Sequence, residues 1–470
     1  MEVSSIANGT IGKTELANTP SCRRGVLRKR GRSTALSKRG AVNRKMICCR
    51  SLIRLNMADP NRRETLPARV LNGARRLLAA PSIRSAFFAF TLTRLLILFV
   101  ILLSANVRFE PPVRDQFGDI HESNISLRNT QVTDVLRRVT LGADSLWIIN
   151  IARAGYEKEP FNTNIQHTWA YFPLYPLLLG ALAKLTGDLP LTGIVLSSSF
   201  FLLALILLHR TVTEFDYDGA VADRAVFYIA AFPVSYFFSL AQTESLFLLL
   251  TVASFYAAKR QRWWLAGICG ALASATRFAG VFLIVPLAVL YWQNYCSRRK
   301  DQGEQRIKAD VAALLLVPLG LIAFMVYLKS ITGNAFAFAD IQVAWGHTAG
   351  MFWRALAGYL RDPLRISARW DFRLLNFAAA VMALIGALVL LKRRQWAFAF
   401  YALISILVPL SYQDSLQSIA RYVMVIFPVF LVIAWAGRSP RVDQTIRALF
   451  IALLSLMSAM LAVRVTLALS

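Results

Sequence analysis

The stretch AFFAFTLTRLLILFVILLSA, residues 86–105, indicates the class of protein to which this chain belongs, and Arg94 is its only charged residue. A helix needs about 17–25 apolar residues to cross a bilayer, because a backbone amide facing lipid must find its partner within the helix. Residues 190–209, 309–329 and 447–463 reach the same length with few charges. The sequence therefore predicts a protein that crosses the membrane several times.

The composition supports this interpretation. The chain has 470 residues, of which 56% are hydrophobic and only 17% are charged, and its mean hydropathy is +0.49. Soluble domains rarely combine so few charges with so much apolar content. Counting the apolar segments between basic clusters predicts an all-α fold with about 11–12 membrane helices.

About half of the net charge of +27 lies ahead of the first span, since residues 1–80 hold 18 Lys and Arg against 4 Asp and Glu. A basic, weakly apolar segment of this kind is expected to be disordered, and basic residues beside a first span favour the cytoplasm. We therefore predict a cytoplasmic tail over residues 1–83 and a membrane domain over 84–470, and no binding to nucleic acid. The 5 cysteines follow neither a disulfide framework nor a metal-ligand spacing.

Basic clusters at 259–262, 297–300, 392–394 and 438–441 are expected on the cytoplasmic side. This orientation leaves residues 106–171 and 330–375 as long outer loops, the first with an interfacial helix around Leu146 and Trp147. The apolar segments between 106 and 259 do not give the odd number of crossings that the orientation needs. Either one segment enters without crossing, for which 172–187 and 246–258 are the candidates, or two segments merge into one span.

Two acidic residues stand where the membrane makes charge costly, which suggests a function. Asp144 precedes a predicted helix, so it could cap that helix, or act as a general base toward a hydroxyl group. Glu244 lies between two apolar segments. It could be solvated, pair with a buried arginine, or orient an acceptor hydroxyl.

Arg277 and Arg421 lie at the predicted outer ends of apolar segments. They could reach toward lipid head groups, or grip a phosphate with the two-pronged geometry of the guanidinium group. The aromatic run HTWAYFPLYPL at 167–177, which includes Tyr175, fits either an interfacial belt or a platform for a sugar ring.

Several motifs resemble the PIG-V family of GPI mannosyltransferases and their bacterial relatives. They are, in order, ADSLWIINIARAGY (143–156), YFPLYPL (171–177), PVSYFFSLAQTESLFLLL (233–250), ATRFAG (275–280), IQVAWG (341–346) and IARYVMVIFPVF (419–430). The resemblance implies a GT-C-type glycosyltransferase fold and makes Asp144 the catalytic base. It assigns Glu244 to the family's acidic motif, and it assigns substrate-binding roles to Arg277, Arg421, Gln342, Trp345, Trp147 and Tyr175. Ala143 and His347 depart from residues common in the family.

The resemblance further implies inverting transfer of mannose, or a related sugar, from a polyprenyl-phosphate donor to a hydroxyl acceptor on the extracytoplasmic face. No cofactor or metal is expected beyond this lipid-linked donor, and the acceptor is left open as a glycan, lipid or protein. We expect a bacterial plasma membrane, or the endoplasmic reticulum if the source is eukaryotic. A transporter or flippase of lipid-linked sugars, and a non-catalytic scaffold subunit, are the alternatives.

Overall fold

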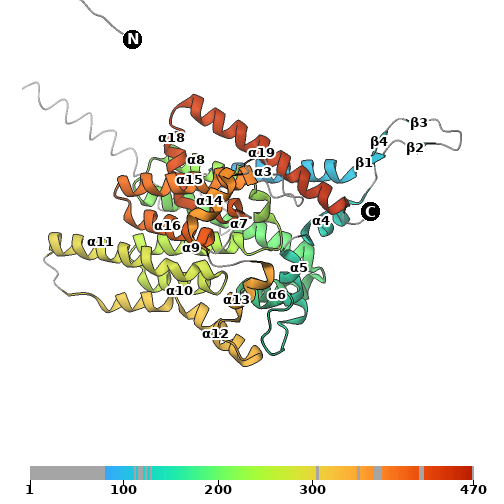
Figure 1. The fold of residues 1–470 in the computed structure, drawn as a ribbon. Coiled ribbons are helices and arrows are strands. Elements are labelled where there is room, and N and C mark those ends of the chain that lie inside the picture. The colour runs from blue at the N-terminus through green and yellow to red at the C-terminus, as the bar shows by residue number, and fades with distance from the viewer. Residues whose placement is uncertain are drawn as a thin grey trace, which may run out of the picture. The chain divides into compact units, whose positions relative to one another are not determined.

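The computed structural model describes residues 80–110, 113–114, 120–121, 124–127, 130–142, 144–302, 306–346, 350–361, 363, 373–411, 416 and 418–467. Nearly all of the predicted tail lies outside these residues, as do Ala143 and His347. The described part is mainly helical (Figure 1). Its first helix, α3, begins at Pro81, where the missing amide proton of proline costs nothing because the first amides of a helix have no partner within it.

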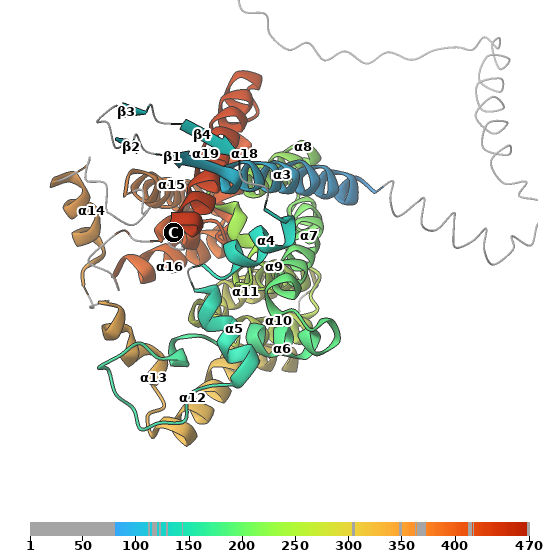
Figure 2. The ribbon, with the colours of Figure 1, turned by 90° about the vertical axis from the view of Figure 1, so that its right-hand side faces the viewer.

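Within the described residues, five helical stretches are long and apolar enough to cross a membrane. They are α3 (Pro81–Asn106), α7 (Leu189–Glu214), the stretch Phe278–Asp301 in η3 and α11, α15 (Arg373–Lys392), and Pro440–Val463 in α19. Four shorter apolar helices accompany them: α6 (Leu174–Thr186), α10 (Trp263–Ser274), α16 (Trp396–Ser411) and α18 (Phe427–Ala436). Helices α3 and α19, from opposite ends of the described chain, lie side by side (Figures 1 and 2). The polytopic character predicted from the sequence is confirmed, whereas the number of crossings stays a prediction.

Prolines break several apolar segments that the sequence presents as continuous. The predicted span 309–329 is in fact a pair, η4 (Ala309–Leu316) and α12 (Leu319–Thr332), bent by 40°. Pro318 lies at that break, and its ring cannot donate the helical hydrogen bond. In the same way, residues 421–436 divide into α17 (Ile419–Val423) and α18, with Pro428 at the start of α18.

The structure shows the course of α6, one of the two short segments that are candidates for entering without crossing. Tyr175, at its beginning, contacts Ser197 of α7, whereas Thr186, at its end, contacts Thr192 of α7. Helix α6 therefore folds back along the first turns of α7 and does not reach the helix's far end. Three stretches then run between the two ends of the bundle: α7, α8 (Gly219–Ala231) with η2 (Ser235–Ser239), and α9 (Glu244–Lys259).

The long loop after α3 contains more structure than the predicted interfacial helix. It contains α4 (Val132–Thr140), α5 (Ser145–Ala154) and η1 (Thr168–Ala170). Ahead of these helices, strand β1 (Val107–Glu110) pairs antiparallel with β4 (Asn124–Leu127), and β2 (Val113–Arg114) pairs with β3 (Ile120–His121). The later loop holds α13 (Ala337–Asp340), η5 (Ile341–Trp345) and α14 (Phe352–Arg361). Both loops therefore contribute ordered elements.

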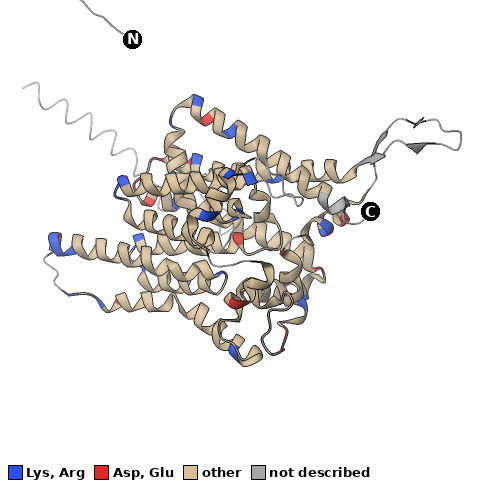
Figure 3. Ribbon diagram, in the orientation of Figure 1, with Lys and Arg blue, Asp and Glu red and all other residues tan. Residues whose placement is uncertain are grey.

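The basic turns gather at one end of the bundle. Lys259 and Arg260 pair with Asp216 and Glu214 at the end of α7, and Arg393 and Arg438 lie over the same Trp435 ring. Figure 3 shows Lys and Arg at these helix ends. Helix α9 runs from Glu244 to this basic end over about 24 Å, at roughly 1.5 Å per residue.

Arg94 lies in the middle of α3, and its two terminal nitrogens are satisfied without a carboxylate, whereas its Nε is buried without a partner. Its terminal nitrogens donate to the carbonyl oxygens of Ala230 and Ser235 and to the hydroxyl groups of Ser235 and Ser239, at 2.8–3.0 Å. Its guanidinium group also lies 4.9 Å from the centre of the Phe201 ring. Arg94 thus supports the chain between α8 and α9, which leads directly to Glu244.

Candidate active site

Four charged side chains meet at the end of the bundle opposite the basic turns, and each comes from a short helix or from the start of a helix. Asp144 precedes α5, and Glu244 is the first residue of α9. Arg277 occupies the extended turn between α10 and η3 (Phe278–Leu283), and Arg421 belongs to the short helix α17. Broken helices bring polar groups into an otherwise apolar bundle, because the chain can turn its side chains inward there.

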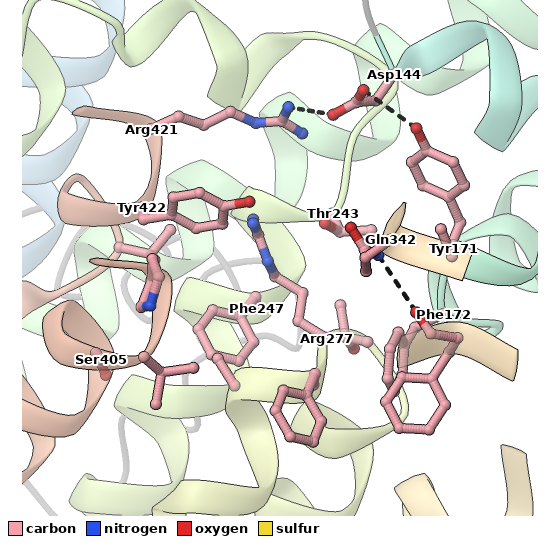
Figure 4. A pocket seen from close by; sticks show the side chains of 18 of the residues that line it. Asp144, Tyr171, Phe172, Thr243, Phe247, Arg277, Gln342, Ser405, Arg421 and Tyr422 are labelled. Carbon is pink, nitrogen blue, oxygen red and sulfur yellow. Dashed lines mark hydrogen bonds and ion pairs between the residues drawn. The ribbon is translucent and has the colours of Figure 1, made fainter. Parts of the chain in front are cut away.

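Arg421 is the centre of this cluster (Figure 4). Its Nη1 donates to Oδ2 of Asp144 and its Nε donates to Oε1 of Glu244, both as ion pairs. The face of its guanidinium group lies over the Phe237 ring, at 4.8 Å from the ring centre. One arginine therefore connects a carboxylate of the long loop after α3 to a carboxylate of the helix bundle.

Glu244 is the buried half of the arrangement. Its side chain has 0% exposure and also accepts from Nη1 of Arg277, at 2.9 Å. The structure therefore confirms a buried partner of arginines and excludes a solvated residue, whereas a role toward an acceptor hydroxyl stays a prediction. A buried carboxylate without a partner costs several kcal/mol, so the two arginines make this burial possible.

Asp144 is the exposed half of the arrangement. Its side chain is 37% exposed, and Oδ1 accepts a hydrogen bond of 3.2 Å from the Tyr171 hydroxyl. The residue stands at the N-cap of α5, but its side chain makes no capping hydrogen bond. Burial favours the neutral carboxyl, yet the charge of Arg421 and the two side-chain hydrogen bonds outweigh it, so the pKa of Asp144 lies below its ordinary value of 3.8.

The cluster opens into a cavity of about 300 Å³. Asp144, Arg277, Arg421 and Gln342 line its charged part, whereas Phe278, Phe282, Ile404 and Val408 line an apolar part between η3 and α16. The cavity can therefore receive a molecule that is anionic and polar along one part and hydrocarbon-like along another.

Three aromatic rings gather beside Asp144. The Trp147 ring stacks on Tyr171, with ring centres 6.2 Å apart, and Trp345 lies edge-on to both, at 6.0 and 6.2 Å. Tyr171 and Trp345 line the cavity directly. Such faces are suited to the apolar C–H groups of a sugar ring.

The structure brings together most of the residues selected from the sequence. Asp144, Arg277, Arg421, Gln342 and Trp345 line the cavity, Glu244 supports it from behind, and Trp147 reaches it through its aromatic neighbours. Tyr175 is different, because its side chain is fully buried and its hydroxyl bonds Ser197 at 2.6 Å. It does not line the cavity.

Among the cavity residues that were not selected from the sequence, Tyr171 and Tyr422 contact the charged cluster directly. Tyr171 holds Asp144, and Tyr422 lies beneath Arg277, whose guanidinium carbon is 5.3 Å from its ring centre. Tyr171 belongs to the YFPLYPL motif and Tyr422 follows Arg421 directly, so both lay within the quoted motifs.

Comparison with known proteins agrees with the motifs. The chain matches the profile of the mannosyltransferase (PIG-V) family over residues 85–350. No curated protein matches it significantly. Among solved structures, it is similar to an oligosaccharyltransferase of Archaeoglobus fulgidus tethered to an acceptor peptide, with 13% identity and a TM-score of 0.37. That match covers 81% of this chain and 55% of the other, so the chain spans about half of that protein's length.

The family match includes Asp144, Glu244 and Arg277, and it ends shortly after Trp345. Because the matched residues make up more than half of the 470-residue chain, the chain belongs to the PIG-V mannosyltransferase family and is a membrane glycosyltransferase.

Proposed function

We propose that the protein transfers mannose, or a closely related sugar, from a polyprenyl-phosphate sugar to a hydroxyl acceptor, with inversion at the anomeric carbon. One observation carries this proposal: an exposed carboxylate, Asp144, lies beside two arginines in a cavity that also has an apolar part. A sugar, a phosphate and a hydrocarbon chain in sequence match these three chemical environments.

In the proposed reaction, Asp144 takes the proton of the acceptor hydroxyl while that oxygen forms a bond to the anomeric carbon. The bond between this carbon and the phosphate oxygen breaks, and its electron pair leaves with the polyprenyl phosphate. The leaving phosphate thereby gains one negative charge, and Asp144 later releases its proton to water. A single displacement of this kind inverts the anomeric centre.

The arginines would stabilise the charge that develops on the phosphate. Fixed cations in a site of low dielectric act strongly on such charge, and guanidinium groups bind phosphate through two parallel hydrogen bonds. Arg277 and Arg421 both face the cavity and are only 16% and 11% exposed. The apolar part lined by Phe278, Phe282, Ile404 and Val408 would take the first isoprene units.

We also propose that the active site faces the extracytoplasmic side. The basic turns at the other end of α9 favour the cytoplasm. A lipid-linked donor would then enter from the outer leaflet, beside η3 and α16.

Asp144→Asn tests the assignment of the base. The amide keeps the size of the side chain but cannot accept a proton from the acceptor, so we expect donor turnover to fall by about 10²–10⁴-fold. Turnover of labelled polyprenyl-phosphate mannose would be measured in native membranes, where the natural acceptor is present.

Asp340→Asn is the matched control, because Asp340 is exposed on α13 and does not line the cavity. It should turn over donor at the wild-type rate. Turnover of Asp144→Asn within about tenfold of wild type would remove Asp144 as the base.

A further inference from the structure

The charges of the cluster already balance one another. Asp144 and Glu244 supply two negative charges and Arg277 and Arg421 supply two positive charges, and Arg421 is engaged by both carboxylates. An arriving phosphate adds negative charge to this group. One of the two carboxylates must then give up its arginine if the phosphate is to be bound with full charge compensation.

We propose that the phosphate of the donor takes the place of Asp144 on Arg421 and thereby releases Asp144 to act as the base. This inference rests on the proposed function. It makes Arg421 a positioning residue that restrains the base while the donor site is empty. Proton abstraction and donor binding would then be coupled through one guanidinium group.

Burial determines which carboxylate leaves. Glu244 has 0% exposure and is held by both arginines, so its release would strand a charge in the apolar bundle. Asp144 is 37% exposed and is held by one arginine, Arg421, which is itself only 11% exposed. Releasing Asp144 costs less than releasing Glu244, because the freed Asp144 carboxylate can be solvated. Asp144 is therefore the partner that a phosphate can replace.

The surroundings of Asp144 favour this exchange. Oδ2 faces Arg421, whereas Oδ1 keeps its hydrogen bond to Tyr171. Arg277 adds its positive charge from the turn before η3, and the ring of Tyr422, which belongs to α17, packs against the Arg277 guanidinium group. After the exchange, Tyr171 would hold the free carboxylate beside the aromatic rings while Arg277 and Arg421 grip the phosphate together.

Chemical labelling of the carboxylates tests the exchange in the full-length purified protein. A water-soluble carbodiimide with an amine, in large excess over phosphate, modifies accessible carboxyl groups, and mass spectrometry locates the products. A polyprenyl phosphate without sugar is the probe, and its retention is measured separately with labelled lipid. We expect bound probe to increase modification of Asp144 several-fold, although the probe fills the same cavity.

Four controls define the result. Glu159, exposed in the outer loop, should react equally with and without probe, and a polyprenol lacking phosphate should leave Asp144 protected. Arg277→Gln should leave Asp144 protected in the absence of probe, whereas Arg421→Gln should expose it. The wild-type comparison decides the matter even if Arg421→Gln does not fold.

The outcomes separate the two proposals. If the probe binds and modification of Asp144 stays constant or falls, the exchange is wrong while the proposed function stands. If the probe does not bind at all, the lipid-phosphate donor is wrong and the exchange falls with it.

Discussion

Glu244 illustrates how much one buried residue determines, since both arginines of the site depend on it. Glu244→Gln should lower the free energy of unfolding by about 3–5 kcal/mol, because two guanidinium groups lose their shared anion inside the bundle. Thermal unfolding in detergent measures the effect. Glu214→Gln is the control, because its pair with Arg260 is partly exposed, at 30% and 48%, and its loss should cost about 1 kcal/mol or less. Equal losses in the two variants would contradict the buried role.

The dependence of turnover on pH also follows from a single residue, Asp144. The pKa of Asp144 lies below 3.8 in the donor-free protein, so its carboxylate persists as the pH falls and is lost only below about pH 4. The acid limb of kcat/KM, which reports the free enzyme, should therefore lie below about pH 4. If donor binding frees Asp144 from Arg421, the acid limb of kcat should lie at higher pH. An acid limb of kcat/KM near neutral pH would argue against this carboxylate as the base.

Among the helices, the contact between α10 and α12 shows why glycine is needed where two helices approach closely. A Cβ atom on Gly320 of α12 would lie 2.0 Å from the carbonyl oxygen of Ala271 in α10. Gly320→Ala should therefore force the helices apart and lower stability by about 1–3 kcal/mol. Gly358→Ala is the control, since nothing lies within 4 Å of its Cβ position in α14, and alanine suits a helix better than glycine. A neutral Gly320→Ala in thermal unfolding would contradict the close packing.

The position at which helix α6 begins explains why the sequence analysis selected Tyr175 and missed Tyr171. The two residues are four positions apart, which on one helix would place them on the same face. Helix α6 begins only at Leu174, however, and Tyr171 precedes it with extended backbone at φ −104° and ψ 131°. The helix turns Tyr175 toward α7, while the extended segment turns Tyr171 toward Asp144. The start of a short helix decided which tyrosine reaches the cavity.

For the whole molecule, the length of an apolar run predicts a span well, because the bilayer imposes that length on every helix independently of its neighbours. Helices α3, α7 and α19 were found in this way. The break at Pro318 and the course of α6 depend on contacts with other helices, and hydropathy does not contain them. Asp144, Glu244, Arg277 and Arg421 stood out because charges are costly in a membrane. Their pairing became visible only in three dimensions.

The orientation of the whole molecule can be tested with single cysteines in a background without native cysteines. Cysteine at Glu159, in the loop beside the site, should react with an impermeant maleimide in intact cells. Cysteine at Arg394, in a basic turn, should react only after the membrane is opened, because basic turns favour the cytoplasm. The reverse pattern would place the active site on the cytoplasmic side and would contradict the proposed use of a donor on the extracytoplasmic side.

Arg94 has a consequence for biogenesis. By insertion scales, an arginine at the centre of a span costs about 2.5–3.5 kcal/mol, and the oxygens that satisfy Arg94 belong to residues 230–239. These residues leave the ribosome long after α3. The first span must therefore wait in the translocon or the lipid with its cation unsatisfied until the chain before α9 arrives. The first span is therefore held stably in the membrane only after residues 230–239 have been synthesised, and these residues directly precede Glu244.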